Sequence, residues 1–107
     1  MKYKVKTIPP FDKELKQLSK KYNSFKKDYE LFLDYIEENP FCGIPIGKDC
    51  HKIRFAIQSK SKGKSGGARI ITCVKIIQST VYLLSVYDKS DFESISEKDL
   101  KERLKEI

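Results

Sequence analysis

The sequence of 107 residues contains no long hydrophobic run. No apolar stretch approaches the roughly 20 residues that a membrane-spanning helix needs. The first residues, MKYKVKTIPP, also lack the apolar core of a signal peptide. We therefore expect a cytoplasmic protein with no membrane partner. The length is that of one ordinary domain, so we expect a single domain over residues 1–107.

Cysteine and histidine are scarce. The three cysteines, Cys42, Cys50 and Cys73, form an odd set without a C-x-x-C pair, and His51 is the one histidine. An odd, unpatterned set argues against a disulfide framework, and adjacent residues such as Cys50 and His51 rarely chelate one ion together. We expect free thiols and no metal or other cofactor. Any hydrolytic chemistry would have to proceed without a pair of histidines.

Acidic residues are absent from residues 50–87. This segment carries seven basic residues: Lys52, Arg54, Lys60, Lys62, Lys64, Arg69 and Lys75. The remaining 15 of the 22 basic residues balance the 15 acidic residues, so the segment holds the whole formal charge of +7. A polyanion is the expected partner. The alternative is a solvated strand with a solubilising loop, but confinement of the net charge to one segment favours binding.

Hydrophobic spacing predicts the elements of the first half of the chain. Residues 2–8 alternate with a period of two, as a half-buried strand does, and Pro9-Pro10 ends them. Apolar residues three and four apart predict a helix over residues 11–21, capped by Asp12. A second helix follows the break at Asn23-Ser24 and stops at Asn39-Pro40. Two amphipathic helices with a short connection form an antiparallel hairpin that must cover a sheet.

The second half of the chain is rich in strand patterns. We expect a loop over residues 41–50, strands over 52–58, 68–77 and 80–87, and a last helix beginning at Ser94 or Ser96. The fold class is therefore α+β in the order β-α-α-β-β-β-α, with an antiparallel-dominated sheet and the helical hairpin packed on one face.

The basic residues divide between a strand and a loop. Lys52 and Arg54 leave the same face of the strand over 52–58 because side chains alternate there. Residues 59–67, SKSKGKSGG, are too polar to pack and read as a flexible basic loop. Gly63-Lys64-Ser65 looks like the end of a phosphate-binding P-loop, but Gln58 occupies the place of its first glycine and a strand follows instead of a helix.

Three sequence motifs, in this order, resemble the RelE/ParE superfamily of toxins from type II toxin-antitoxin modules, closest to the RelE and HigB branch. Lys52-Ile53-Arg54 opens a strand in KIRFAI, Arg69 follows two glycines in GGARIITCV, and an aliphatic strand ends in Tyr87-Asp88-Lys89 within VYLLSVYDKSD. The resemblance covers most of the chain, from the helical hairpin to the last strand.

The resemblance implies a metal-independent endoribonuclease that cuts messenger RNA on the ribosome and so inhibits translation. A cognate antitoxin would neutralise it, and operator DNA would be bound only through that antitoxin. Family catalytic positions carry over onto Lys52, Arg54, Arg69 and Lys89. The position of the usual RelE tyrosine corresponds to Ile95, so Tyr87 would act as its substitute.

The residue types suit this chemistry. Arg54 and Arg69 can bind phosphate oxygens through paired donors and stabilise the transition state. Lys52 is the candidate base, and Lys89 or Tyr87 the acid toward the leaving oxygen. The remaining lysines are expected to bind the RNA backbone: Lys60, Lys62, Lys64 and Lys75. Two alternatives stay open: a ParE-like DNA gyrase inhibitor, which generally lacks the full basic set, and a non-enzymatic nucleic-acid-binding regulator.

Overall fold

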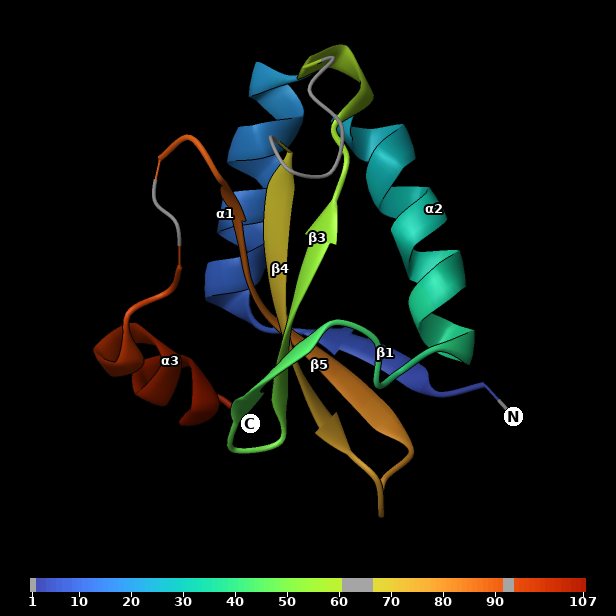
Figure 1. Ribbon diagram of the computed structural model, residues 1–107, viewed down its shortest axis with the longest axis vertical. Coiled ribbons are helices and arrows are strands. Elements are labelled where there is room, and N and C mark those ends of the chain that lie inside the picture. The colour runs from blue at the N-terminus through green and yellow to red at the C-terminus, as the bar shows by residue number, and fades with distance from the viewer. Residues whose placement is uncertain (1, 61–66, 92–93) are drawn as a thin grey trace.

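The computed structural model describes residues 2–60, 67–91 and 94–107 (Figure 1). Its elements are β1 (Lys4–Thr7), α1 (Pro9–Lys21), α2 (Phe25–Glu38), β2 (Ile44–Gly47), β3 (Cys50–Phe55), the 3-10 turn η1 (Gln58–Lys60), β4 (Ala68–Lys75), β5 (Thr80–Asp88) and α3 (Glu97–Leu104). The strands form one sheet in the order β1-β5-β4-β3-β2. β1 runs parallel to β5, and the other neighbouring strands are antiparallel. The predicted α+β fold and its element order are confirmed.

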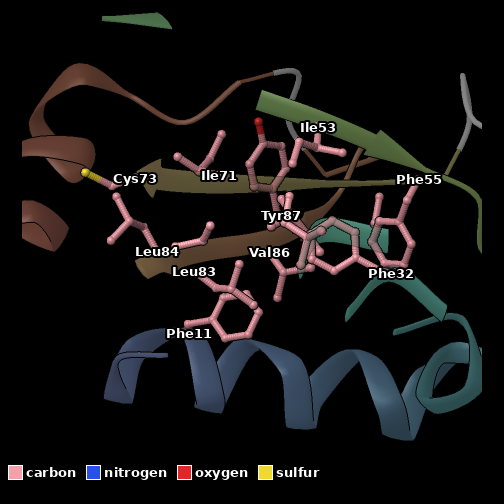
Figure 2. Close-up of a cluster of buried hydrophobic side chains, with 14 of the residues drawn as sticks. Phe11, Phe32, Ile53, Phe55, Ile71, Cys73, Leu83, Leu84, Val86 and Tyr87 are labelled. Atoms are coloured by element: carbon pink, nitrogen blue, oxygen red, sulfur yellow. The ribbon is translucent and has the colours of Figure 1, made fainter. Parts of the chain in front are cut away.

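The helices α1 and α2 cover one face of the sheet (Figure 2). Their apolar stripes supply the buried residues Phe11, Leu18, Phe25, Phe32 and Ile36. On the sheet side, the ring of Phe55 lies 5.6 Å from that of Phe25 and 5.9 Å from that of Phe32. Full burial of each such side chain stabilises the fold by about 1.5–3 kcal/mol. The helical hairpin predicted from the 3.6-residue period is therefore present.

The prediction of an uninterrupted loop over residues 41–50 was wrong. β2 lies within it and pairs antiparallel with β3, with Ile44 opposite Lys52. The tight turn between the two strands holds Lys48 and Asp49 at φ of 56° and 64°. Gly47 and Pro45 had argued against a strand, but β2 is a short edge strand, and edge positions tolerate proline.

The helix starts differ in detail from the predicted caps. Asp12 lies in the first turn of α1 and not at its cap, because Pro9 and Pro10 already occupy the first helical positions and Ile8 is the N-cap. At α3 the prediction is confirmed, since the Ser96 hydroxyl accepts a hydrogen bond from the Asp99 N–H at 3.1 Å.

Side chains from two helices cover the edge of β5 beyond the end of β1. β1 pairs with β5 only as far as Leu83. The next backbone groups along this edge of β5 bond to Glu14 of α1 and Arg103 of α3, which form an ion pair with each other. The Val86 N–H donates to Glu14 Oε1 at 3.2 Å, and Arg103 Nη1 donates to the Leu84 carbonyl at 2.7 Å. This arrangement holds α3 beside the sheet and links it to α1 through the Arg103–Glu14 ion pair. No helix in the described part of the chain is long and apolar enough to cross a membrane.

Candidate functional site

Three side chains form a row across the middle of the sheet. Arg54 on β3 lies opposite Arg69 on β4, and Arg69 lies opposite Tyr87 on β5. All three project from the face that α1 and α2 leave uncovered. Figure 2 shows the Tyr87 hydroxyl directed away from α1, on the other side of the sheet from Phe11. Strand alternation thus brings together residues that lie up to 33 positions apart in the chain.

The two arginines of the row are close neighbours. The hydrogen bond from the Val74 N–H to the Asp49 carbonyl, 2.9 Å long, shows which opposite residues of β3 and β4 are hydrogen-bonded pairs. Because hydrogen-bonded and non-hydrogen-bonded pairs alternate, Arg54 and Arg69 form a non-hydrogen-bonded pair. The Cα atoms of such pairs approach to about 4.5 Å. Like charges directly opposite one another destabilise a sheet. A pairing that costs stability in this way is typical of a site built to hold an anion.

Arg69 is the more enclosed of the two arginines. It is 4% exposed, and its Nη1 donates to the Ala68 carbonyl at 3.2 Å. Burial, together with the positive charge of Arg54, lowers the pKa of Arg69, and Tyr87 opposes this shift. Arg54 is exposed to solvent. An incoming phosphate would therefore meet Arg54 first and would relieve the repulsion between the two guanidinium groups.

Tyr87 is a buried phenol beside this charge. Burial raises the pKa of Tyr87, although hydrogen bonding from the Ile95 backbone and the Ser94 side chain and the charge of Arg69 act in the opposite direction. The group is therefore protonated at neutral pH and can serve as a proton donor. Ile95, the position predicted to correspond to the RelE tyrosine, thus has its backbone beside the Tyr87 hydroxyl.

Lys52 and Lys89 extend the row at its two ends. Lys52 lies two residues before Arg54 on the same face of β3, roughly 6.6 Å along the strand. The Lys89 N–H donates to the Gly67 carbonyl at 3.1 Å, which continues the pairing of β5 with β4. Alternation places Lys89 on the same side as Tyr87. We call Lys52, Arg54, Arg69, Tyr87 and Lys89 together the basic row.

The four lysines expected to bind RNA do not join the basic row as a group. The Lys60 ammonium forms an ion pair with Asp88, its Nζ lying 2.7 Å from Oδ1, and its side chain is only 8% exposed. Lys75 lies six residues from Arg69, roughly 20 Å along β4, opposite Thr80. Lys62 and Lys64 lie outside the described residues.

Asp88 is a structural residue that no sequence motif marks as important. Its carboxylate accepts hydrogen bonds from Tyr22, from Lys60, and from the backbone and hydroxyl of Ser90. Burial alone would raise the pKa of Asp88, but these donors outweigh it and hold the pKa well below its usual value. The sequence contains one sign of this structural role. Asp88 lies between Tyr87 and Lys89, and because side chains alternate along a strand, it must point to the face opposite these two site residues.

A cavity of about 680 Å³ opens beside the basic row, between α2 and β3. Lys52 and Arg54 line it together with apolar side chains of α2 and β2. The three cysteines are free thiols, as expected. Among residues 2–60, 67–91 and 94–107, no group of three or more His, Cys, Asp or Glu side chains could hold a metal ion.

Comparisons with known proteins identify the fold. No family model and no curated protein matches the sequence. The solved structures that match include those of bacterial toxins. A free double arginine-to-alanine mutant of E. coli RelE has a TM-score of 0.63 at 20% identity and covers 100% of this chain and 99% of its own. A crystal structure of isolated E. coli RelE has a TM-score of 0.62 at 21% identity, with 96% of each chain covered. The chain therefore has the RelE toxin fold, as the resemblance predicted.

A third matching structure is a metal-bound toxin from Helicobacter pylori. It has a TM-score of 0.49 at 17% identity and covers 84% of this chain and 98% of its own.

Proposed function

We propose that the protein is the toxin of a type II toxin-antitoxin module and acts as a metal-independent endoribonuclease on messenger RNA at the ribosome. The observation that carries the proposal is the basic row, in which two arginines and a protonated tyrosine face one another across three adjacent strands. The RelE fold supports the same conclusion. The proposed place of action is the cytoplasm, where ribosomes translate.

The row provides a group for each step of RNA cleavage through the 2′-hydroxyl. Lys52 takes the proton of the 2′-hydroxyl, whose oxygen attacks the adjacent phosphorus. Arg54 and Arg69 stabilise the charge that develops on the phosphoryl oxygens. Lys89 or Tyr87 gives a proton to the departing 5′-oxygen. The products are a 2′,3′-cyclic phosphate and a 5′-hydroxyl, and the step requires no further reactant.

The electrostatics favour phosphate as the ligand. Arg54 and Arg69 are held opposite each other although their repulsion opposes folding. A purely structural role would be served better by a neutral or oppositely charged residue at one of these positions. Binding of a phosphate diester converts the repulsion into two favourable contacts, so the stability lost in the free protein is recovered on the substrate.

The same charge explains why a partner would be needed. A protein with a formal charge of +7 attracts RNA of any sequence, and an active ribonuclease halts growth of its own host. A cognate antitoxin that covers the basic row would keep the enzyme silent. Operator DNA would then be reached through the antitoxin.

Primer extension on transcripts after induction tests the proposed activity. The wild-type protein should cut messages inside codons, and Arg54→Ala should abolish the cuts. Arg54 is exposed, so its replacement leaves the core intact. Lys75→Ala, at the far end of β4, is the matched control and should cut like the wild type.

Two results would contradict the proposal. Intact transcripts together with DNA damage would identify a gyrase inhibitor, and unhindered growth would identify a binding protein without enzymatic activity. Equal cutting by wild type and Arg54→Ala would remove Arg54 from the chemistry.

A further inference from the structure

Cys50 on β3 and Cys73 on β4 lie directly opposite each other. They form a non-hydrogen-bonded pair of the ladder, the kind in which opposite side chains lie closest. The two thiols converge on one atom, because Cys50 Sγ lies 3.4 Å and Cys73 Sγ lies 3.8 Å from the Lys48 carbonyl oxygen. The fold therefore holds two free thiols side by side.

The two cysteines are enclosed by the protein. Cys50 is 1% exposed and Cys73 is 0% exposed. The carbonyl that both thiols approach belongs to the tight turn between β2 and β3, where Lys48 and Asp49 are exposed to solvent. This turn is the shortest way by which a small ion would reach the sulfur atoms, and the burial would then keep competing water away from it.

No nitrogen or carboxylate ligand joins the two sulfur atoms. His51 follows Cys50, but side chains alternate along β3, and its ring lies 6.3 Å from that of Phe41 on the other side of the sheet. Cys42 lines the separate cavity between α2 and β3. Within the described ranges no third His, Cys, Asp or Glu side chain completes a metal-binding group with the pair. The site thus offers two soft ligands and no hard side-chain ligand.

The number and kind of ligands select the ion. Zinc takes three or four protein ligands, and calcium and magnesium take oxygen ligands, so two thiols suit none of them. Thiolates are the soft ligands that select Cu(I), whose filled d shell allows a stable complex with two ligands alone. Such a complex carries one net negative charge. Lys75 lies two residues beyond Cys73 on the same face, and its charge acts on Cys73 more strongly than that of Asp49 does.

We propose that Cys50 and Cys73 form a binding site for a single Cu(I) ion between β3 and β4. Each thiol gives up its proton to solvent and binds the ion through sulfur, so the copper is neither oxidised nor reduced. The bound ion links the two strands that also carry Arg54 and Arg69. It takes no part in the proposed RNA cleavage, and the site does not depend on that function.

An anaerobic titration of the full, reduced chain with Cu(I) tests the site, with the coloured chelator bicinchoninate as competitor. The wild-type protein should withhold one Cu(I) per chain from the chelator. Cys50→Ser and Cys73→Ser should each weaken the binding by at least about 100-fold, because a single thiolate is left. Cys42→Ser, the matched change at the third cysteine, should bind copper within twofold of wild type.

Amide spectra of the ¹⁵N-labelled wild type locate the ion without any substitution, so the test holds even if a serine variant fails to fold. Cu(I) should shift the signals of Lys48, Cys50 and Cys73 and leave that of Cys42 in place. Zn(II) is the comparison ion and should shift none of the three. The site is refuted if the chelator removes all copper from the wild type, if Cys50→Ser or Cys73→Ser keeps the wild-type affinity, or if Zn(II) binds there as tightly as Cu(I).

Discussion

Lys60 and Asp88 form a buried ion pair, with Nζ 2.7 Å from Oδ1, that ties the turn η1 to the end of β5. Lys60 Nζ also donates to the Ser90 hydroxyl at 2.8 Å and lies 5.7 Å from the centre of the Tyr22 ring. The pair thus connects α1, η1 and the strand that carries Tyr87. The ion pair lies on the helix side of the sheet, opposite the face that carries the basic row, and there it stabilises the end of β5 next to Tyr87.

Asp88 should make the stability of the protein depend on pH in the acid range. Its pKa is lower in the folded state than the unfolded value of about 3.9, so its contribution is fully present above that pH and is lost as the pH falls toward the folded pKa. Asp88→Asn should lose stability at pH 7 by about 3 kcal/mol, because Lys60 remains buried without its counter-charge. The deficit relative to wild type should shrink below about pH 4.

Urea unfolding at several values between pH 7 and pH 2.5 measures this difference. Asp34→Asn, an exposed position on α2, is the control and should run parallel to the wild type. If the curve for Asp88→Asn also stays parallel to wild type down to pH 2.5, the ion pair does not carry the acid sensitivity.

Arg54 should be required for RNA cleavage although it lowers the free energy of unfolding. Arg54→Gln removes the charge opposite Arg69 but keeps a polar side chain that can donate hydrogen bonds. We expect cleavage of ribosome-bound message to fall at least about 100-fold, as it does when one transition-state donor is lost. The free energy of unfolding should stay equal or rise by roughly 0.2–1 kcal/mol, because a like-charge pair disappears. Cleavage rates and urea titrations of Arg54→Gln, with Lys75→Gln as the control, measure the two effects. If Arg54→Gln lost cleavage activity and stability together, the loss of activity would be due to misfolding.

Arg103 should hold α3 in place through its paired contacts with Glu14. Nη1 lies 2.9 Å from Oε1 and Nη2 lies 3.0 Å from Oε2, and both side chains are mostly buried. A double-mutant cycle over Glu14→Gln and Arg103→Gln should give a coupling of about 1–3 kcal/mol. Arg103→Lys should not restore it, since an ammonium cannot make the forked contact and still reach the Leu84 carbonyl.

The exposed pair Glu97 and Lys101, one turn apart on the same helix, is the matched comparison. Its coupling should stay under about 0.5 kcal/mol. Similar coupling energies for the two pairs would show that the Arg103 contacts at the edge of β5 do not stabilise the fold more than an exposed ion pair does.

Local periodicity was enough to predict most of the fold and part of the site. The alternation of β3 placed Lys52 and Arg54 on one face, and the 3.6-residue stripes of α1 and α2 placed the hairpin. The two apolar residues outside those stripes, Leu31 and Tyr35, were visible in the sequence as well. Their position outside the stripes indicates an exposed apolar surface on α2, as the structure has it.

Contacts between distant positions were not predictable in the same way. Lys60 and Asp88 are 28 residues apart, and nothing in a lysine-rich loop distinguishes the lysine that turns inward. The burial of Arg69 depends on the packing around a central strand and not on its neighbours in the chain. β2 was missed because its glycine and proline content describes a loop unless the adjacent strand β3 is already known.

Cys50 and Cys73 should form a disulfide under mild oxidation. They are buried and opposite each other in a non-hydrogen-bonded pair of β3 and β4, where side chains lie close, and both thiols point to the Lys48 carbonyl, at 3.4 and 3.8 Å. A hydrogen bond from Cys50 lowers the pKa of Cys73 below its usual value, against the effect of burial. The Cys73 thiolate attacks hydrogen peroxide to give a sulfenic acid and hydroxide, and the Cys50 thiol then displaces water to form the bridge.

Mass spectrometry should show the loss of two hydrogens, reversed by dithiothreitol, with Cys42 still free to react with maleimide. The rate should rise with pH and level off below the usual pKa of a free thiol, because the pKa of Cys73 is lowered and only its thiolate reacts. Cys50→Ser should stop at the sulfenic acid. A bridge that includes Cys42, or a rate that keeps rising tenfold per pH unit up to pH 9, would show that the cross-strand pair is not the reactive one.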